Sequence, residues 1–282
     1  MMKTFEHIGV STNLLDDRKS LAASIERLAD DFSVIEIEIE NDARFWISAS
    51  GFDVATEVDR CLAVKEKKGL YFSVHGPYLG VRADIANLNE KDRCCAVDLM
   101  LRSMALAAHI GATRFTFHPG LLTRDPDDFE SLFAQLRKSL VVMAENAVRL
   151  GLTLCIENTG NERPRYIKLD DMRHDELCKE FGVRLTMDLV HFASFYGLED
   201  NYLERLLPIL EYVDNIHIAD MNVPKHIHLP LGAGTYQYDR AIEFVFANGY
   251  TGNIIVEERG SKYSEIDYIK AAADYRRRLA AT

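Results

Sequence analysis

The chain has 282 residues, of which 48% are hydrophobic and 27% are charged, as in an ordinary globular protein. Its formal net charge is −11, which argues against a nucleic-acid partner, because proteins that bind a phosphate backbone usually carry a basic surface. Charged residues interrupt every apolar run well before the roughly 18 residues that a membrane span needs, so we expect no membrane segment.

The five cysteines and the first residues favour a cytoplasmic protein. Cys94 and Cys95 are adjacent and the other three stand apart. An odd number without paired spacing favours reduced thiols over disulfides or a cysteine metal site. The opening residues, Met-Met-Lys-Thr-Phe-Glu, lack the apolar core of a secretory signal, so we expect none.

Short apolar segments alternate with amphipathic segments along the whole sequence. We expect strands at residues 5–11, 33–39, 70–75, 114–118, 153–157, 184–188, 215–218 and 253–257. We expect helices near residues 17–30, 53–68, 89–110, 127–150, 170–181, 199–212, 238–248 and 264–280. Gly111, Gly151 and Gly182 each follow a periodic run, which is typical of a helix end. Eight strand–helix pairs predict an α/β fold, a (β/α)8 TIM barrel that forms one domain over residues 1–282.

Imidazoles and carboxylates stand at or near the ends of six successive predicted strands. They are His75, His118, Glu157, Asp188, His217 and Glu257. The carboxyl ends of barrel strands surround one mouth, so these side chains should converge there. Any one of them alone would be read as a buried polar residue satisfied by a neighbour. Together they would repel one another unless a cation held them, and the mixture suits Zn²⁺, Mn²⁺ or Fe²⁺ better than Ca²⁺.

Two short spacings extend this predicted metal site. Asp188 and His191 are three residues apart, so a turn after the strand can fold His191 back beside Asp188. His226 and His228 form an HxH pair just before a glycine-rich stretch, where a loop could cover the mouth as a lid. The pair alone is a weak signal that an exposed loop would explain equally well. Glu36, Glu38 and Glu40 alternate along one strand, which favours a polar barrel lining or a solvent-facing edge over substrate contact.

These motifs resemble the xylose isomerase-like barrel superfamily, and most closely its endonuclease IV branch, also called AP endonuclease family 2. The resemblance rests on HGPYL, FHPG, IENT, DLVH, IHIAD, HxxLGxG and VE, which occur here in the family's order. That branch holds three metal ions with nine side chains. Eight of those positions match in residue type: His75, His118, Glu157, Asp188, His191, His217, His228 and Glu257. The ninth is Asp in the family but His226 here, which exchanges an anionic ligand for a neutral one.

The sugar isomerases and epimerases of the same superfamily need a single metal ion. Their ligand pattern of two Glu, one Asp and one His is matched by Glu157, Asp188, His217 and Glu257. In that chemistry the metal polarises the substrate while the two glutamates move a proton. The pattern gives no role to His75, His118 or the HxH pair.

The larger ligand set favours a metal-dependent hydrolase of a phosphoester, and we expect a small-molecule phosphodiester as substrate. Glu157 and Glu257 are the expected catalytic residues, and one to three Zn, Mn or Fe ions are the expected cofactors. Two ions about 3.5–4 Å apart would bind the attacking water and the departing oxygen. The alternative is a single-metal isomerase or epimerase of a sugar or sugar phosphate, and a third possibility is a non-catalytic metal-binding barrel. The sequence leaves the oligomeric state open.

Overall fold

The computed structural model describes residues 7–15, 20–39, 54–78, 80–121, 129–159, 173–198, 201–222, 225–257 and 263–281. Eight parallel strands close into a barrel in the order β1-β10-β7-β6-β5-β4-β3-β2. They are β1 (Ile8–Ser11), β2 (Val34–Glu38), β3 (Tyr71–His75), β4 (Arg114–Phe117), β5 (Thr153–Glu157), β6 (Arg184–Asp188), β7 (Val213–Ile218) and β10 (Asn253–Val256). The predicted (β/α)8 TIM barrel is confirmed.

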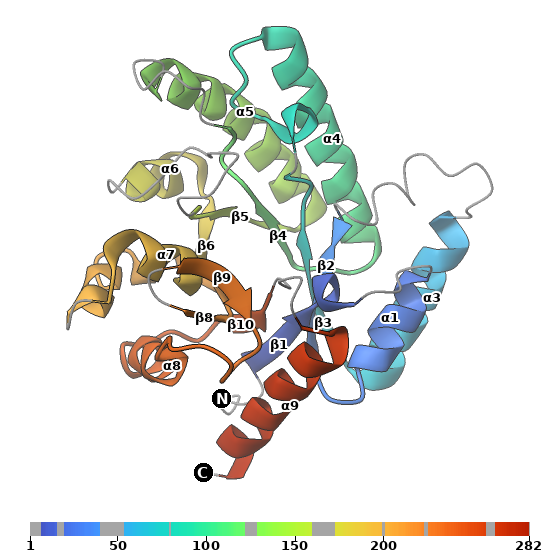
Figure 1. Cartoon of the computed structure of the whole chain (residues 1–282). Coiled ribbons are helices and arrows are strands. Elements are labelled where there is room, and N and C mark those ends of the chain that lie inside the picture. Colours follow the sequence, from blue (N-terminus) through green and yellow to red (C-terminus); the bar gives the residue numbers. More distant parts are fainter. Residues whose placement is uncertain are drawn as a thin grey trace.

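Helices surround the strands on the outside of the barrel (Figure 1). They are α1 (Leu21–Leu28), α3 (Val54–Lys68), α4 (Glu90–His109), α5 (Phe129–Leu150), α6 (Arg173–Phe181), α7 (Leu189–Tyr196), α8 (Tyr238–Ala247) and α9 (Glu265–Ala281). Within the described residues, no helix is both long enough and apolar enough to cross a membrane.

Successive residues of a strand point to opposite faces, and here the two faces differ in chemistry. In β2, Ile35 and Ile37 belong to the apolar core that the helices cover, whereas Glu36 and Glu38 alternate with them and are equally buried. Parallel pairing places Glu36 level with Ser73 of β3. The inner face of the barrel is therefore largely polar, and the apolar core lies between the strands and the helices.

One predicted helix was wrong. Residues 199–212 were expected to form a helix, but the described part of this range contains two 3₁₀ turns, Tyr202–Leu206 and Leu210–Tyr212. The α-helix comes earlier, as α7, directly after β6. The first turn of α7, Leu-Val-His-Phe, is buried throughout and has His191 as its single polar residue, so it lacks the polar stripe that distinguishes a surface helix. Several ends of the predicted segments, and Glu40, lie outside the described residues.

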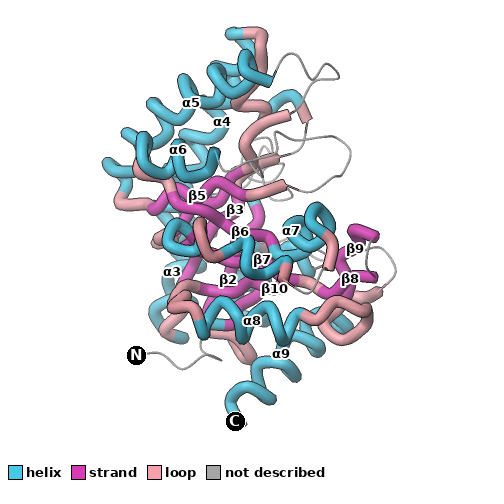
Figure 2. Tube along the Cα trace, turned by 90° about the vertical axis from the view of Figure 1, so that its left-hand side faces the viewer, coloured by secondary structure: helices cyan, strands magenta, loops and turns pink. Residues whose placement is uncertain are grey.

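A second difference is an antiparallel hairpin at the mouth of the barrel, where the sequence indicated a loop. It consists of β8 (Asp220–Asn222) and β9 (Lys225–Leu229). Figure 2 shows the hairpin at one end of the barrel, on the side of α7, and α7 packs against β9. His228 lies on β9 and is buried. His226 lies on the same strand, but its side chain falls outside the described residues, so its predicted ligand role stays a prediction.

Candidate metal centre

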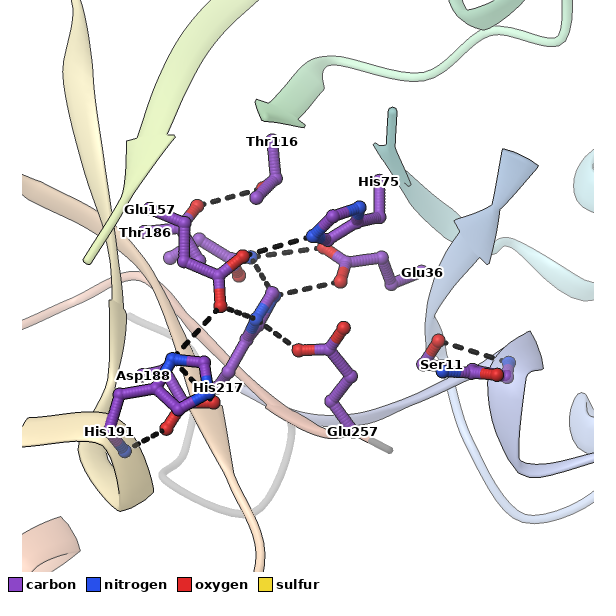
Figure 3. A network of polar contacts seen from close by, with 12 residues as sticks. Ser11, Glu36, His75, Thr116, Glu157, Thr186, Asp188, His191, His217 and Glu257 are labelled. Atoms are coloured by element: carbon purple, nitrogen blue, oxygen red, sulfur yellow. Dashed lines mark hydrogen bonds and ion pairs between the residues drawn. The ribbon is translucent and has the colours of Figure 1, made fainter. Parts of the chain in front are cut away.

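Glu157, at the end of β5, lies at the middle of the polar mouth. Its Oε2 atom is 2.9 Å from Nε2 of His75 and 3.2 Å from Nε2 of His118. Its Oε1 atom is 3.4 Å from Nδ1 of His217, which also contacts Oε2 of Glu257. Figure 3 shows these side chains, other than His118, pointing toward one another from separate strands. The barrel thus brings His75 of β3, His118 just after β4 and His217 of β7 to the carboxylate at the end of β5.

The buried residues form overlapping groups whose potential ligand atoms lie within 4.8 Å of one another. The largest group, here called the tetrad, comprises Glu157, Asp188, His217 and Glu257. The His75 cluster comprises His75, His118 and Glu157, and the His191 cluster comprises Asp188, His191 and His228. A further group joins Glu38 to His75 and Glu257. Apart from His226, the structure places every predicted ligand in at least one group.

Two of the imidazole rings, those of His75 and His191, are held as metal-binding histidines usually are, with one ring nitrogen on a backbone carbonyl. A backbone carbonyl oxygen can only accept, so Nδ1 of His75 donates to Gly76 O at 2.8 Å and leaves Nε2 facing Glu157. Nδ1 of His191 likewise donates to Asn158 O at 2.9 Å. Oriented imidazoles among buried carboxylates fit a cation that accepts nitrogen and oxygen ligands, such as Zn²⁺, Mn²⁺ or Fe²⁺.

The two glutamates of the tetrad have opposite pKa shifts. Burial disfavours the ionised form of Glu157, but His217 and His118 outweigh it and hold the pKa of Glu157 well below its usual value. Burial raises the pKa of Glu257 to about 7, although His217 opposes the shift. Near neutral pH, therefore, Glu157 is ionised, whereas Glu257 holds a proton for part of the time.

The histidines show how the centre balances its charge without a metal. Burial alone would lower the pKa of His75, but the glutamates around it, Glu38 foremost, raise it well above the usual value. Glu257 foremost does the same for His217. His118 differs, because burial lowers its pKa. Protons on His75 and His217 thus offset the buried carboxylates, and a divalent cation would take their place.

Residues that were not identified from the sequence hold Asp188 in place. The side chain of Asn158 spans to the next strand, donating to the backbone carbonyl of Asp188 at 3.0 Å and accepting from its N–H at 2.6 Å. Asp188 in turn caps α7, and its Oδ1 accepts from the backbone N–H of His191 at 2.8 Å. This first helical turn is what brings His191 beside Asp188.

The hairpin that carries His228 is anchored at two points. The Asp220 carboxylate accepts backbone N–H groups from Met221, Gly232, Gly234 and Tyr236, at 2.7–3.0 Å. The hydroxyl of Tyr268 on α9 donates to the carbonyl of His228 at 2.8 Å. A Cβ on Gly234 would lie 2.5 Å from Met221 O, so the backbone approach requires glycine there. The glycine-rich motif therefore positions the hairpin, a role that motif spacing alone did not indicate.

Comparisons with known proteins agree with this architecture. The sequence model described as "Xylose isomerase-like TIM barrel" matches residues 24–279. The uncharacterized protein MJ1188 of Methanocaldococcus jannaschii is 26% identical over 212 residues, 70% of this chain and 72% of that protein. A protein named "Probable endonuclease 4" from Mycobacterium tuberculosis is 26% identical over 183 residues, 62% of this chain and 69% of its own length.

Solved structures share the fold over nearly the whole chain. A D-tagatose 3-epimerase-like protein superposes with a TM-score of 0.78 at 21% identity, covering 99% of this chain and 98% of that one. The 3-keto-D-glucoside 4-epimerase YcjR from E. coli gives 0.72 at 19% identity, covering 96% and 99%. With the family match extending over most of the sequence, the chain belongs to the xylose isomerase-like TIM barrel family.

Proposed function

We propose that this protein is a metal-dependent isomerase or epimerase of a sugar or sugar phosphate. The observation that carries the proposal is the tetrad, a complete four-ligand group with Glu157 and Glu257 on either side of one histidine nitrogen. This reverses the order that the sequence favoured.

The two glutamates supply what isomerisation at a carbon beside a carbonyl requires, a base and an acid at one centre. Glu157 is ionised well below neutral pH and can accept a proton. Glu257, with a pKa of about 7, can return one. Asp188 and His217 complete the group that would hold the cation. When bound, the cation would polarise the carbonyl and hydroxyl oxygens of the substrate.

The remaining support is indirect. The solved epimerases share the fold at about 20% identity, which makes the scaffold compatible with the proposal but says nothing of the reaction. The net charge of −11 favours a small substrate over a polyanion such as duplex DNA.

A second candidate is the phosphoester hydrolase that the sequence favoured. The His75 and His191 clusters flank the tetrad on both sides, and an enzyme that used the tetrad alone would give them no role. Together the three groups could hold two or three ions, the arrangement that in-line displacement at phosphorus uses. The 26% identity to proteins named as endonucleases also supports this candidate.

Metal stoichiometry and proton exchange together separate the two candidates. An isomerase should retain one tightly held ion per chain in elemental analysis of protein purified without added metal. It should also incorporate deuterium beside the carbonyl of a ketose when a panel of ketoses is incubated in D₂O. Two or three ions per chain, with cleavage of bis(p-nitrophenyl) phosphate and no deuterium incorporation, would reject the isomerase and support the hydrolase.

A further inference from the structure

Glu36 is a fully buried carboxylate inside the barrel, one layer below the candidate metal centre. Its Oε2 accepts from Ser73 Oγ at 2.8 Å and from Asn215 Nδ2 at 3.0 Å. Its Oε1 lies 2.8 Å from Nε2 of His217 (Figure 3). A buried carboxylate costs free energy unless hydrogen bonds and charges compensate for it. Three polar partners from β3 and β7 provide that compensation here.

The contact with Glu36 decides which nitrogen of His217 faces the centre. A carboxylate oxygen only accepts, and at 2.8 Å it would repel a bare nitrogen lone pair, so Nε2 carries the hydrogen. The amide nitrogen of Asn215 is 3.2 Å from the same ring nitrogen, farther away than the carboxylate oxygen. Nδ1 then points to Glu157 and Glu257. Glu36 and the tetrad thus lie on opposite sides of one imidazole ring.

The partner of His217 differs in kind from that of the other oriented rings. His75 and His191 donate to neutral backbone carbonyls, Gly76 O and Asn158 O, and the Glu38 carboxylate is 3.6 Å from Nδ1 of His75, beyond hydrogen-bond distance. His217 faces a carboxylate. A negative charge on the far nitrogen raises the basicity of the near nitrogen and strengthens it as a ligand. The tetrad therefore contains a histidine whose far nitrogen is hydrogen-bonded to a carboxylate, which makes it a stronger ligand than His75 or His191.

We propose that Glu36 is a positioning residue that fixes His217 with Nδ1 toward the tetrad and makes the tetrad the tightest cation site of the centre. This inference rests on the metal centre of the proposed function, and it holds for either reaction. It assigns a role to Glu36, one of the alternating glutamates of β2, which is not among the predicted metal ligands.

The test compares cation affinity in Glu36→Gln with that in a matched variant, Glu57→Gln. Glu57 is also buried, but it accepts from Ser20 Oγ and Ala22 N at the start of α1, outside the barrel. The dissociation constant of the first equivalent of Zn²⁺ is measured by competition with a chromophoric chelator. We expect it to rise about 10–100-fold in Glu36→Gln, as when an outer partner of a metal ligand is lost. We expect no change in Glu57→Gln.

Two further measurements separate positioning from a purely structural role. If Glu36→Gln lowers the melting temperature of the metal-free protein but keeps the parent's Zn²⁺ affinity, the inference is overturned. Nitrogen-15 NMR of the Zn²⁺-loaded parent needs no variant to fold. It should show the hydrogen of His217 on Nε2 and the metal on Nδ1, and the opposite assignment also overturns the inference. A parent that binds no Zn²⁺ tightly would overturn the proposed function as well.

Discussion

The molecule has two buried regions of opposite chemistry, separated by the thickness of one strand. Between the strands and the helices lies an apolar layer, represented in β2 by Ile35 and Ile37. Inside the barrel the alternate residues Glu36 and Glu38 are just as inaccessible to water. Barrel interiors are commonly filled with branched apolar side chains. Here the outer layer supplies the hydrophobic stabilisation, and the interior holds the charged side chains in position.

The largest effect should come from Glu157→Gln, because Glu157 belongs to both the tetrad and the His75 cluster. Bound metal should be lost, and activity should fall by more than the ~100-fold that follows loss of an outer partner. The apolar layer is untouched, so the helical circular dichroism and cooperative unfolding should persist. Elemental analysis checks the loss of bound metal, and a thermal melt checks that cooperative unfolding persists. A variant that keeps its metal would show that the centre lies elsewhere.

An intermediate effect is expected for His118→Ala, which removes one member of the His75 cluster and no member of the tetrad. An isomerase should keep its single ion and most of its turnover, because His118 holds no part of the four-ligand group. A hydrolase should lose an ion and its activity together. Metal content and turnover, measured on the same preparation, decide between the two, and the parent protein is the control.

The smallest and most gradual effect should be that of pH on metal uptake. The carboxylates raise the pKa of His75 and His217, and protons must leave these rings before a cation binds. Affinity should therefore weaken as the pH falls. The contribution of these two histidines to the stability of the metal-free protein should run the opposite way, because a raised histidine pKa stabilises the fold at low pH and that contribution is lost as pH rises through the folded value. Calorimetry in buffers of different ionisation enthalpy should detect proton release; its absence would contradict the charge balance inferred here.

Periodicity predicted most of the fold because most elements satisfy the pattern locally. Gly111, Gly151 and Gly182 end helices with positive φ values of 75°, 68° and 66°, as their positions after periodic runs predicted. The wrong prediction at 199–212 has a local cause as well, since the first turn of α7 is buried with His191 as its single polar residue, and the more polar segment after α7 forms 3₁₀ turns. A surface helix is identified from sequence by one polar face, and the first turn of α7 has no such face.

The candidate ligands could be identified from the sequence because each stands at or near a strand end, and strand ends converge in a closed barrel. The residues that hold these ligands in place could not be identified in the same way. Glu36 meets His217 only because β2 and β7 face each other across the interior, which depends on strand order rather than on any local motif. Asp220 accepts hydrogen bonds from backbone N–H groups, and every residue other than proline has such a group, so the sequence does not indicate which ones it binds. Strict alternation of Glu36 and Glu38 was the one usable signal, and it indicated a polar barrel lining or a solvent-facing edge without identifying a partner.

Closure of the barrel also affects the order in which the chain can fold during synthesis. β1 pairs with β10, so the first and last strands of the sheet must meet before either has both of its neighbours. Until then β1 and β7 present open edges, and the pairing of β1 with β10 joins strands from opposite ends of the sequence, the kind of pairing that forms late. Glu257 follows β10 directly and arrives with it. During synthesis on the ribosome the tetrad therefore stays incomplete until the last strand emerges, and a product that stops before it would have neither a closed sheet nor a full cation site.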